Sequence, residues 1–421
     1  MTNNMVSNRP ADQQLVREIS EVFPWGHPQW AQSIPVRRGF LRNDRPLISA
    51  DTDCEAVAMW LAEVAKNSER TLEAYKREAE RLLLWAADSG MALSEVLRDD
   101  LSAYHDFLED PPKNSPLIGK KVYKRTDIRW RPFTGALSEN SIKASFTILR
   151  SLYSYLSSSA WLRANPFPDK KFKPAPEPDP GKRSLNKFEM RAIFSWLSVN
   201  STSAKTDFQR LTAARTRWVV AILLHLGLRE SECAMASMGD FEYVRQAKRN
   251  FWELAVTGKG GKRASIAASE QCMQEVQRFR VELGLSPMPS PGEEFPLVPD
   301  LRQFRKNSSE AASQAKYFKP VERTLIYKLV KDVFRRAADL LEAAGGPEED
   351  AAERAHAAAN LRRASPHWLR HTSITDLVAV EPDLTIAQKF ARHTNINTTA
   401  HYAKKGNEEV ADRLEKRPRY E

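Results

Sequence analysis

Residues 218–232 read WVVAILLHLGLRESE, and this stretch indicates a buried helix that leads into a charged turn. Its apolar part ends at Leu228 and includes His225 and Gly227, so it is too short to span a bilayer. An apolar run of this length is typical of a core helix, and glycine commonly ends helices. We therefore expect a buried helix that ends near Gly227, with Arg229 directly after it.

Toward the C-terminus the hydrophobic period changes to two, which is typical of strands. Two alternating runs are separated by three glycines: Trp252, Leu254 and Val256 form the first run, Ala264, Ile266 and Ala268 the second, and Gly258, Gly260 and Gly261 lie between them. This pattern predicts a hairpin with Lys259 and Lys262 at its tip. The rest of residues 184–421 reads as mostly helical, interrupted by an alanine-rich charged segment at about 336–360. We expect a mixed α/β domain there.

Toward the N-terminus, the segment NPFPDKKFKPAPEPDPGKR ends at Arg183 and carries six prolines among many charges. Such a segment cannot pack as a core element, because proline removes backbone donors and breaks helices. We take residues 169–183 as an extended linker between two domains. A stiff spacer suits two domains that must clasp opposite sides of a rod-like ligand.

Residues 51–168 show the three and four residue steps of amphipathic helices, for example Leu72, Tyr75 and Ala79, with Ser138 as the N-cap of a second such helix. Between these helices, residues 111–137 form a basic insertion with seven Lys and Arg side chains against Asp127. Residues 1–50 lack clear periodicity and indicate an irregular N-terminal extension. The predicted fold class is mainly α with one small hairpin or sheet.

Composition limits the function classes. The net charge of +10 and the pI near 9.4 favour a polyanionic partner. Cys54, Cys233 and Cys272 lie far apart, which argues against a disulfide framework and a thiolate zinc site. The N-terminus has no apolar signal core, so we expect a soluble protein of the reducing cytoplasm, without a membrane.

Four short clusters hold groups that can do chemistry: Arg229 in GLRESE, Lys259 in TGKGGKRAS, His367 and Arg370 in SPHWLRHT, and His393 and Tyr402 in ARHTNINTTAHYAK. Each has an ordinary structural explanation when taken alone. His367 and His371 have the spacing of a zinc pair, but the accompanying Glu is missing, and GKGGKR does not fit a phosphate loop. Together, these groups can handle a phosphodiester without a metal, because guanidinium groups bind its oxygens, imidazoles and an ammonium move protons, and a phenol is a nucleophile.

The order of these motifs resembles that of the tyrosine recombinases, the phage integrase family. The twenty-six positions from His367 to His393 and the nine from His393 to Tyr402 are both typical of the family. Residues 71–161 also resemble the family's helical core DNA-binding domain. One departure is Arg392, which stands where the family usually has glycine.

The resemblance implies a role for each residue. Tyr402 would attack the scissile phosphate and form a 3′-phosphotyrosyl link, while Arg229 and Arg370 would clamp the nonbridging oxygens. Lys259 would protonate the departing 5′ oxygen, His367 would accept or orient the tyrosine proton, and His393 would hydrogen-bond the phosphate. No cofactor and no metal would be needed.

The resemblance further implies a site-specific recombinase of a prokaryotic mobile element that acts on double-stranded DNA in the nucleoid, as a dimer on one site and a tetramer in synapsis. Accessory recombinases or DNA-bending proteins are possible partners of such an enzyme. We assign DNA contacts to the most basic positions: Lys120, Lys121, Lys124, Arg125, Lys262 and Arg263. Two alternatives stay open, a type IB topoisomerase and a DNA-binding relative without catalysis. A metal-dependent nuclease would need a carboxylate cluster near these basic residues, which the sequence lacks.

Overall fold

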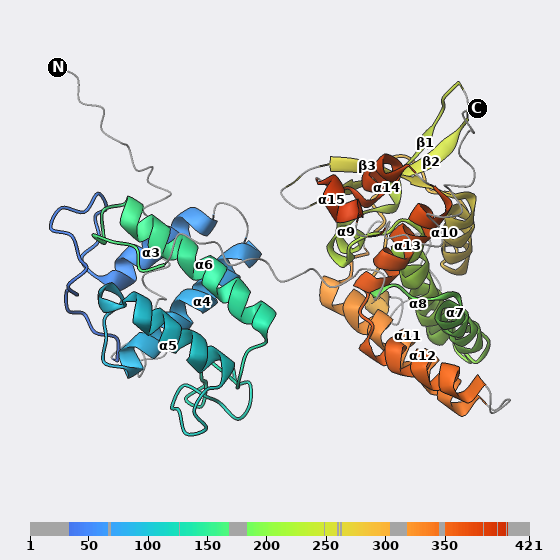
Figure 1. The fold of residues 1–421 in the computed structure, drawn as a ribbon. Helices are drawn as coiled ribbons and strands as arrows, with labels where there is room; N and C mark the ends of the chain where they lie inside the picture. Colours follow the sequence, from blue (N-terminus) through green and yellow to red (C-terminus); the bar gives the residue numbers. More distant parts are fainter. Residues whose placement is uncertain are drawn as a thin grey trace, which may run out of the picture. The chain divides into compact units, whose positions relative to one another are not determined.

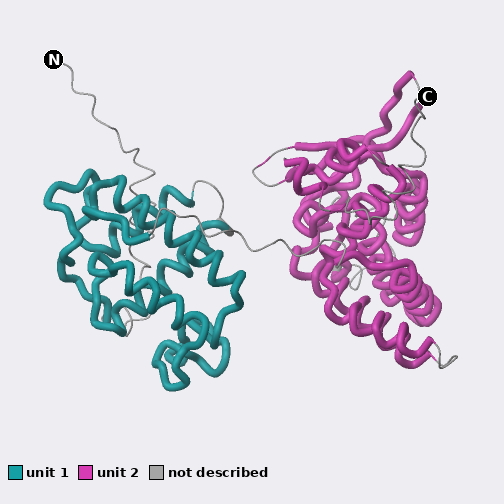
Figure 2. Tube along the Cα trace, in the orientation of Figure 1, with its two compact units in different colours: residues 1–177 teal, residues 178–421 magenta. Residues whose placement is uncertain are grey.

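The computed structural model describes residues 33–65, 69–125, 127–167, 183–247, 249–258, 261, 263–303, 318–344, 350–381, 383–393, 395–400 and 402. The chain divides into two compact units, residues 1–177 and 178–421, and each has its own hydrophobic core (Figures 1 and 2). The boundary lies within the predicted linker, of which only Arg183 belongs to the described residues. Among the described helices, none has the length and apolar character needed to cross a membrane.

Unit 1 is helical, and its elements are α3 (Asp53–Ala65), α4 (Glu69–Asp88), η1 (Leu93–Glu95), α5 (Arg98–Glu109) and α6 (Glu139–Ser158). The predicted cap of the last helix is confirmed, because Ser138 Oγ accepts a hydrogen bond from the backbone N–H of Ser141 at 3.4 Å. Leu149 and Leu152 on its apolar face are fully buried. The helix therefore begins and faces the core as the sequence pattern requires.

A tryptophan that follows α6 ties the N-terminal part of unit 1 to its core. The indole of Trp161 is fully buried, and its Nε1–H donates to Asp53 Oδ1 at 3.0 Å. The guanidinium of Arg42 lies 3.2 Å from the centre of the same ring. Residues 33–50, predicted to be irregular, contain no helix or strand, and Ile34 and Ala50 are buried in the core of unit 1, whereas residues 1–32 lie outside the described residues.

The basic insertion, residues 111–137, is a loop between α5 and α6, here called the basic loop. Its described residues contain no helix or strand, and two of them, Leu117 and Phe133, are buried in the core of unit 1. The backbone N–H of Gly119 donates to the carbonyl of Phe133 at 2.7 Å. The loop is therefore anchored at its base by apolar burial and a backbone bridge.

Unit 2 is mainly helical, with one small sheet. Its helices are α7 (Lys187–Thr202), α8 (Asp207–His225), α9 (Glu230–Met235), η3 (Met238–Asp240), α10 (Glu270–Glu282), η5 (Leu301–Gln303), α11 (Arg323–Ala343), α12 (Ala351–Arg363), α13 (His367–Val380), α14 (Leu384–Ala391) and α15 (Ile396–Ala400). Figure 1 places the sheet at one end of this unit and the pair α11 and α12 at the other. This architecture confirms the predicted fold class.

The central helix α8 ends where the sequence predicts. Its apolar run is buried, with Trp218 Nε1 donating to the carbonyl of Leu297 at 2.7 Å. Gly227 follows in the left-handed conformation, with φ +53°. A Cβ at this position would lie 3.1 Å from Cε1 of Phe390 on α14, so glycine serves both the turn and the close approach of the two segments.

The sheet contains the predicted hairpin and one further strand. Strands β1 (Phe241–Val244), β2 (Phe251–Thr257) and β3 (Arg263–Ala268) are antiparallel in the order β1-β2-β3. The predicted runs face each other residue by residue, for example Leu254 opposite Ile266. The four residues of β1 are too few to show an alternating pattern, which is why the sequence did not reveal this strand. The tip residues Lys259 and Lys262 lie outside the described residues.

The alanine-rich segment at 336–360 was predicted to interrupt the helical pattern, and most of it is helical instead. Helix α11 continues to Ala343, and α12 packs against it. Arg362 bridges the two helices, donating to Asp339 at 2.9 Å and to Glu342. Alanine has the highest helix propensity, so an alanine-rich charged run favours helix over loop.

Candidate active site

Five of the six predicted catalytic residues come together in unit 2. Arg229 is the N-cap of α9, and His367 and Arg370 lie in the first turn of α13. His393 follows α14, and Tyr402 follows α15. The sixth, Lys259, lies outside the described residues.

Arg370 is the most buried member of the cluster, with 2% of its surface exposed. Its Nη1 donates to the carbonyl of Gly227 and its Nη2 to the carbonyl of Ala391. The guanidinium thus joins α13 to the end of α8 and to the end of α14. Burial, together with the positive charges of Arg392 and Arg229, lowers its pKa to about 9. An anion bound beside this guanidinium would stabilise its charged form.

A buried carboxylate, Glu232 on α9, holds two guanidinium groups. Its Oε1 accepts from Arg229 Nη1 at 2.7 Å, and its Oε2 accepts from Arg392 Nη2 at 2.7 Å. Burial alone would raise the pKa of Glu232, but Arg392, the backbone N–H of Arg229 and the Arg229 side chain lower it below its usual value. Sequence reasoning did not assign Glu232, although its place three residues after Arg229, the spacing of helical neighbours, was a usable signal.

Arg392 ends α14 in the left-handed conformation, with φ +54°. Its side chain turns inward and is 9% exposed, and Nη2 also lies 3.3 Å from the carbonyl of Gly227. Glycine, which the family resembled by the motifs usually has at this position, adopts this conformation at little cost. In this chain the guanidinium of Arg392 compensates the charge of Glu232.

The phenol of Tyr402 lies against a histidine that sequence reasoning had set aside. His371 Nδ1 is 2.5 Å from Tyr402 Oη, and the two rings stack with centroids 5.5 Å apart. His367 meets His371 edge to face at 4.6 Å, and the ring of His393 lies 6.2 Å from that of Tyr402. The available signal was the four-residue spacing from His367, which places both imidazoles on one face of α13.

The three histidines are held in the neutral form. Burial, then His367, Arg183, Arg370 and His393, lowers the pKa of His371 to about 3. Burial and the guanidinium groups of Arg370, Arg229 and Arg392 lower the pKa of His393 to about 4. The pKa of His367 is lowered too, by desolvation of its ring and by Arg370, although the side chain keeps contact with solvent. At neutral pH the imidazoles are therefore uncharged, while the arginines carry the positive charge.

His393 is fixed by its own neighbour. Its Nδ1 lies 3.0 Å from Thr399 Oγ1 on α15, and Thr399 is fully buried. This contact sets the ring orientation and leaves Nε2 as the nitrogen for a further partner. The segment from His393 to Tyr402 is thus tied to the cluster at both ends.

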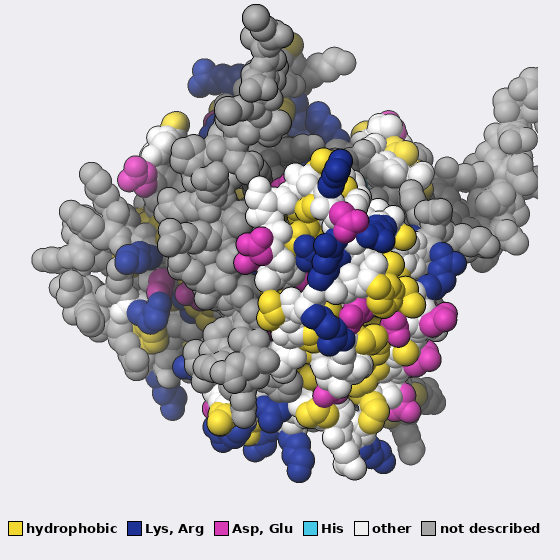
Figure 3. All heavy atoms as spheres, turned by 90° about the vertical axis from the view of Figure 1, so that its left-hand side faces the viewer, with side chains coloured by type: hydrophobic (Ala, Val, Ile, Leu, Met, Phe, Trp, Pro, Cys, Tyr) yellow, Lys and Arg dark blue, Asp and Glu magenta, His cyan; other side chains and the backbone are white. Residues whose placement is uncertain are grey.

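The predicted DNA contacts that belong to the described residues fall into two groups. Lys120, Lys121 and Lys124 on the basic loop are exposed, and so is Arg263 at the start of β3. Arg125 instead pairs with the buried carboxylate of Glu80, and its guanidinium lies 4.9 Å from the ring of Trp130. Lys262 lies outside the described residues. Figure 3 shows Lys and Arg side chains among acidic and apolar ones, several of them along the lower edge of the view.

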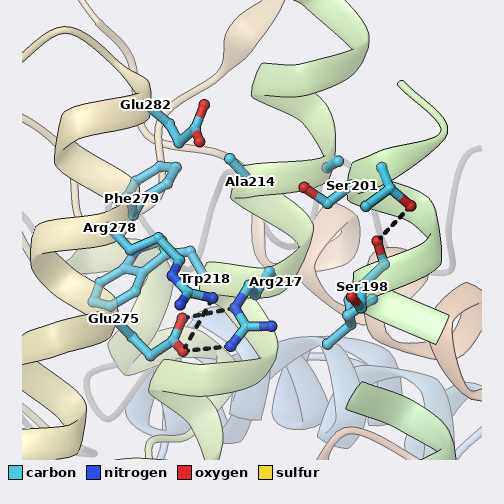
Figure 4. Close-up of a pocket in the computed structure, with 12 residues that line it drawn as sticks. Ser198, Ser201, Ala214, Arg217, Trp218, Glu275, Arg278, Phe279 and Glu282 are labelled. Atoms are coloured by element: carbon cyan, nitrogen blue, oxygen red, sulfur yellow. Dashed lines mark hydrogen bonds and ion pairs between the residues drawn. The ribbon is translucent and has the colours of Figure 1, made fainter. Parts of the chain in front are cut away.

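A separate pocket lies between α7, α8 and α10 and includes none of the candidate catalytic residues (Figure 4). In it the guanidinium of Arg217 forms a two-pronged pair with Glu275, with distances of 2.9 and 2.6 Å. Arg278 also approaches this carboxylate, at 4.0 Å. Among the described residues, no group of three or more His, Cys, Asp or Glu side chains is arranged to hold a metal ion.

Comparison with known families gives a match over the C-terminal part of the chain. Residues 348–409 match the phage integrase family, a range that contains His367, Arg370, His393 and Tyr402. A tyrosine recombinase of Thermosipho africanus (strain TCF52B) is 21% identical over 369 residues, which is 87% of this chain and 99% of that protein. The tyrosine recombinase XerC of Staphylococcus aureus (strain MSSA476) is 22% identical over 320 residues, 74% of this chain and 86% of that protein.

Solved structures share the fold. The XerH site-specific recombinase, bound to a palindromic difH substrate in a post-cleavage complex, aligns with a TM-score of 0.54 at 14% identity and covers 98% of both chains. The integrase of the Tn1549 transposon, in complex with circular intermediate DNA, aligns with a TM-score of 0.50 at 17% identity, over 87% of this chain and 99% of that one.

Proposed function

This chain belongs to the tyrosine recombinase, or phage integrase, family, and from that premise we propose that it cuts and rejoins double-stranded DNA at specific sites through a 3′-phosphotyrosyl intermediate. The observation that carries the proposal is the position of the Tyr402 phenol, 2.5 Å from an imidazole nitrogen and within a cluster of guanidinium groups. A phenol needs a nearby base or a positive field to react, because its ordinary pKa is about 10. Both are present around Tyr402.

In the proposed cleavage, Tyr402 Oη attacks the scissile phosphorus, and the bond to the 5′ oxygen breaks. Lys259 gives a proton to the departing oxygen, and His393 donates a hydrogen bond to a nonbridging oxygen. His367 is the residue that the family resemblance assigns to the tyrosine proton. The energy of the broken bond is kept in the phosphotyrosine ester, so a second strand can be joined by the reverse step.

Before a phosphate binds, the guanidinium groups of the two catalytic arginines have different hydrogen-bond partners. Arg370 uses one N–H of each Nη on a backbone carbonyl, and each Nη carries a second N–H that can reach an anion. Arg229 is 37% exposed and rests on Glu232, which Arg392 continues to neutralise when Arg229 turns to the phosphate. Both arginines thereby stabilise the charge of the pentacoordinate transition state.

We further propose how the units divide the work. Unit 1 contributes a DNA-binding surface through the basic loop, and unit 2 holds the chemistry, with protomers acting as dimers on one site and tetramers in synapsis. Double-stranded DNA as substrate fits a cytoplasmic, nucleoid-associated enzyme of a prokaryotic mobile element. Accessory recombinases or DNA-bending proteins would join at the synapsis stage. The net charge of +10 supports a polyanionic substrate.

Trapping the covalent intermediate tests this function. Genomic DNA fragments are incubated with the protein in the presence of a chelator, and DNA that stays attached in detergent is sequenced to give the site. A nicked duplex of that site then serves as a suicide substrate, because the short strand diffuses away after cleavage. We expect a covalent complex with wild-type protein and none with Tyr402→Phe.

A matched variant controls for removal of a phenol elsewhere. Tyr327→Phe changes an exposed tyrosine on α11 and should react like wild type. A covalent complex that persists in Tyr402→Phe would remove Tyr402 as the nucleophile. Relaxation of supercoils without strand exchange between two duplexes would replace recombinase by type IB topoisomerase, and sequence-specific binding without any cleavage would indicate a non-catalytic relative.

A further inference from the structure

One group within hydrogen-bond distance of the nucleophilic oxygen is not among the residues that the family pattern assigns. Tyr402 Oη lies 2.5 Å from His371 Nδ1, within hydrogen-bond distance. His393 has its Nδ1 engaged by Thr399 Oγ1 at 3.0 Å, and the centre of its ring is 6.2 Å from that of Tyr402. His367 contacts the ring of His371, edge to face at 4.6 Å.

We propose that His371 is a catalytic residue: its Nδ1 accepts the proton of Tyr402 Oη as this oxygen attacks the scissile phosphate, and it returns the proton when the strand is rejoined. This inference rests on the proposed function and adds a proton acceptor to it. In cleavage, the Oη–P bond forms, the P–O5′ bond breaks, the phenol proton goes to His371 Nδ1, and the proton for O5′ comes from Lys259. The reverse step restores the neutral imidazole and the phenol.

The position of His371 on α13 supports this assignment. Arg370 is the preceding residue, so the acceptor and a phosphate-binding guanidinium are built on one rigid helical turn. The ring of Tyr402 stacks on that of His371 with an interplanar angle of 30°, which holds the phenol against the acceptor. A base that shares a helix with the phosphate clamp keeps its distance to the reacting oxygen fixed.

The charges around His371 make the pKa of its imidazole depend on whether a substrate phosphate is bound. The groups that face it are His367 and Arg370 on α13, Arg183 before α7, His393 after α14, and Tyr402. Without DNA, burial, the neighbouring histidines and the charges of Arg183 and Arg370 lower the pKa of His371 to about 3, so the imidazole is a weak acceptor for the phenol proton. A phosphodiester bound by Arg229 and Arg370 adds negative charge, which raises the pKa of the imidazole. Proton transfer is thereby coupled to DNA occupancy.

If His371 acts as a base, its loss changes how the cleavage rate depends on pH. If it only positions the phenol, its loss lowers the rate without changing that dependence. In His371→Asn, Oδ1 can accept the phenol hydrogen bond in the place of Nδ1 but cannot take the proton. Single-turnover cleavage of the nicked duplex is measured from about pH 6 to about pH 9.5 for wild type, His371→Asn and the matched control His356→Asn, which changes an exposed histidine on α12. We expect the asparagine variant to be slower by about 10²- to 10⁴-fold at about pH 7, the usual contribution of a general base.

The shape of the profile of cleavage rate against pH distinguishes a base role of His371 from a positional one. Without a base the phenol must ionise before attack, so the His371→Asn rate should rise about tenfold per pH unit below about pH 9, while the wild-type rate changes little. The His356→Asn rate should follow wild type. A His371→Asn rate near wild type, or one reduced by the same factor at every pH, would overturn the base role.

A second substitution keeps the test open if His371→Asn folds poorly. Replacing Tyr402 by 3,5-difluorotyrosine gives a more acidic phenol, which should speed cleavage in His371→Asn and in His371→Ala much more than in the wild-type background. Equal effects in the three backgrounds would contradict the proposal. Wild-type cleavage that Tyr402→Phe abolishes, together with an unaffected His371→Asn, would overturn this inference and leave the proposed function standing.

Discussion

At the scale of single residues, Arg392 combines an unfavourable backbone with a favourable side chain. Its φ of +54° lies in the left-handed region, which costs an L-residue about 1–2 kcal/mol. The side chain offsets this cost through the buried pair with Glu232 at 2.7 Å and a hydrogen bond to the carbonyl of Phe390 at 3.1 Å. Arg392 therefore combines a strained backbone with charge compensation inside the candidate active site.

Two variants at this position separate the two effects. Arg392→Ala and Arg392→Gly both remove the guanidinium, but only glycine relieves the left-handed strain. We expect both to be less stable than wild type and the glycine variant to be more stable than the alanine variant by about 1 kcal/mol. Urea denaturation, followed by tryptophan fluorescence, measures the difference. Equal free energies of unfolding would show that residue 392 is not strained.

At the scale of elements, the cations of the basic loop have two different roles: one anchors the loop to the core, and the others are available to bind DNA. Arg125 pairs with Glu80, whose side chain is only 3% exposed, whereas Lys120, Lys121 and Lys124 are exposed. An arginine that compensates a buried carboxylate maintains the fold, and exposed lysines are available to phosphate groups. Sequence reasoning placed all four in one class because charge alone does not reveal a buried partner.

The two roles predict different effects of substitution. Changing Lys120, Lys121 and Lys124 together to alanine should weaken DNA binding and reduce the slope of log K against log salt by about 0.9 for each phosphate that the variant no longer neutralises. Stability should stay within about 0.5 kcal/mol of wild type, as for most surface changes. Fluorescence anisotropy of a labelled duplex, titrated at several salt concentrations, measures the slope.

Arg125→Ala is the contrasting variant for the same loop. It should lower the free energy of unfolding of unit 1 by about 1–3 kcal/mol, because the variant leaves Glu80 without this partner in a buried position. Its salt slope should stay close to that of wild type. An unchanged stability in Arg125→Ala, or an unchanged salt slope in the triple variant, would contradict this division of roles.

At the scale of the whole molecule, each unit packs its own core around a buried tryptophan. Trp161 lies in the core of unit 1, and Trp218 lies in that of unit 2. The two clusters share no residue, so the units should unfold as separate cooperative blocks. Residues with similar burial in the two cores offer a direct comparison.

Leu152→Ala in unit 1 and Leu223→Ala in unit 2 each empty a buried site, since these leucines are 0% and 1% exposed. Each should cost about 2–5 kcal/mol in its own unit. Calorimetry of the full chain should resolve two transitions, with each substitution lowering the midpoint of one of them. A single transition, or two that shift together, would mean that the cores are energetically coupled.

Sequence by itself determined the elements and the chemical inventory of this protein. The helix end near Gly227, the cap at Ser138 and the pairing of β2 with β3 follow from local sequence patterns, which the adjacent residues fully encode. The order and spacing of the arginine, histidine and tyrosine motifs indicated phosphodiester chemistry and the family. The four-residue strand β1 and the helical character of residues 336–343 and 351–360 were missed, because short or alanine-rich runs carry little periodic signal.

Only the tertiary structure decided which of these groups meet. The contact of His371 with Tyr402 spans 31 positions, that of Arg392 with Glu232 spans 160, and that of Arg370 with Gly227 spans 143. Hydrophobic periodicity fixes which face of a helix is buried, but it does not state which distant side chain will lie beside it. The ends of α8, α13 and α14 converge through core packing, and that packing selects His371 as the neighbour of the phenol and turns Arg392 toward a buried carboxylate.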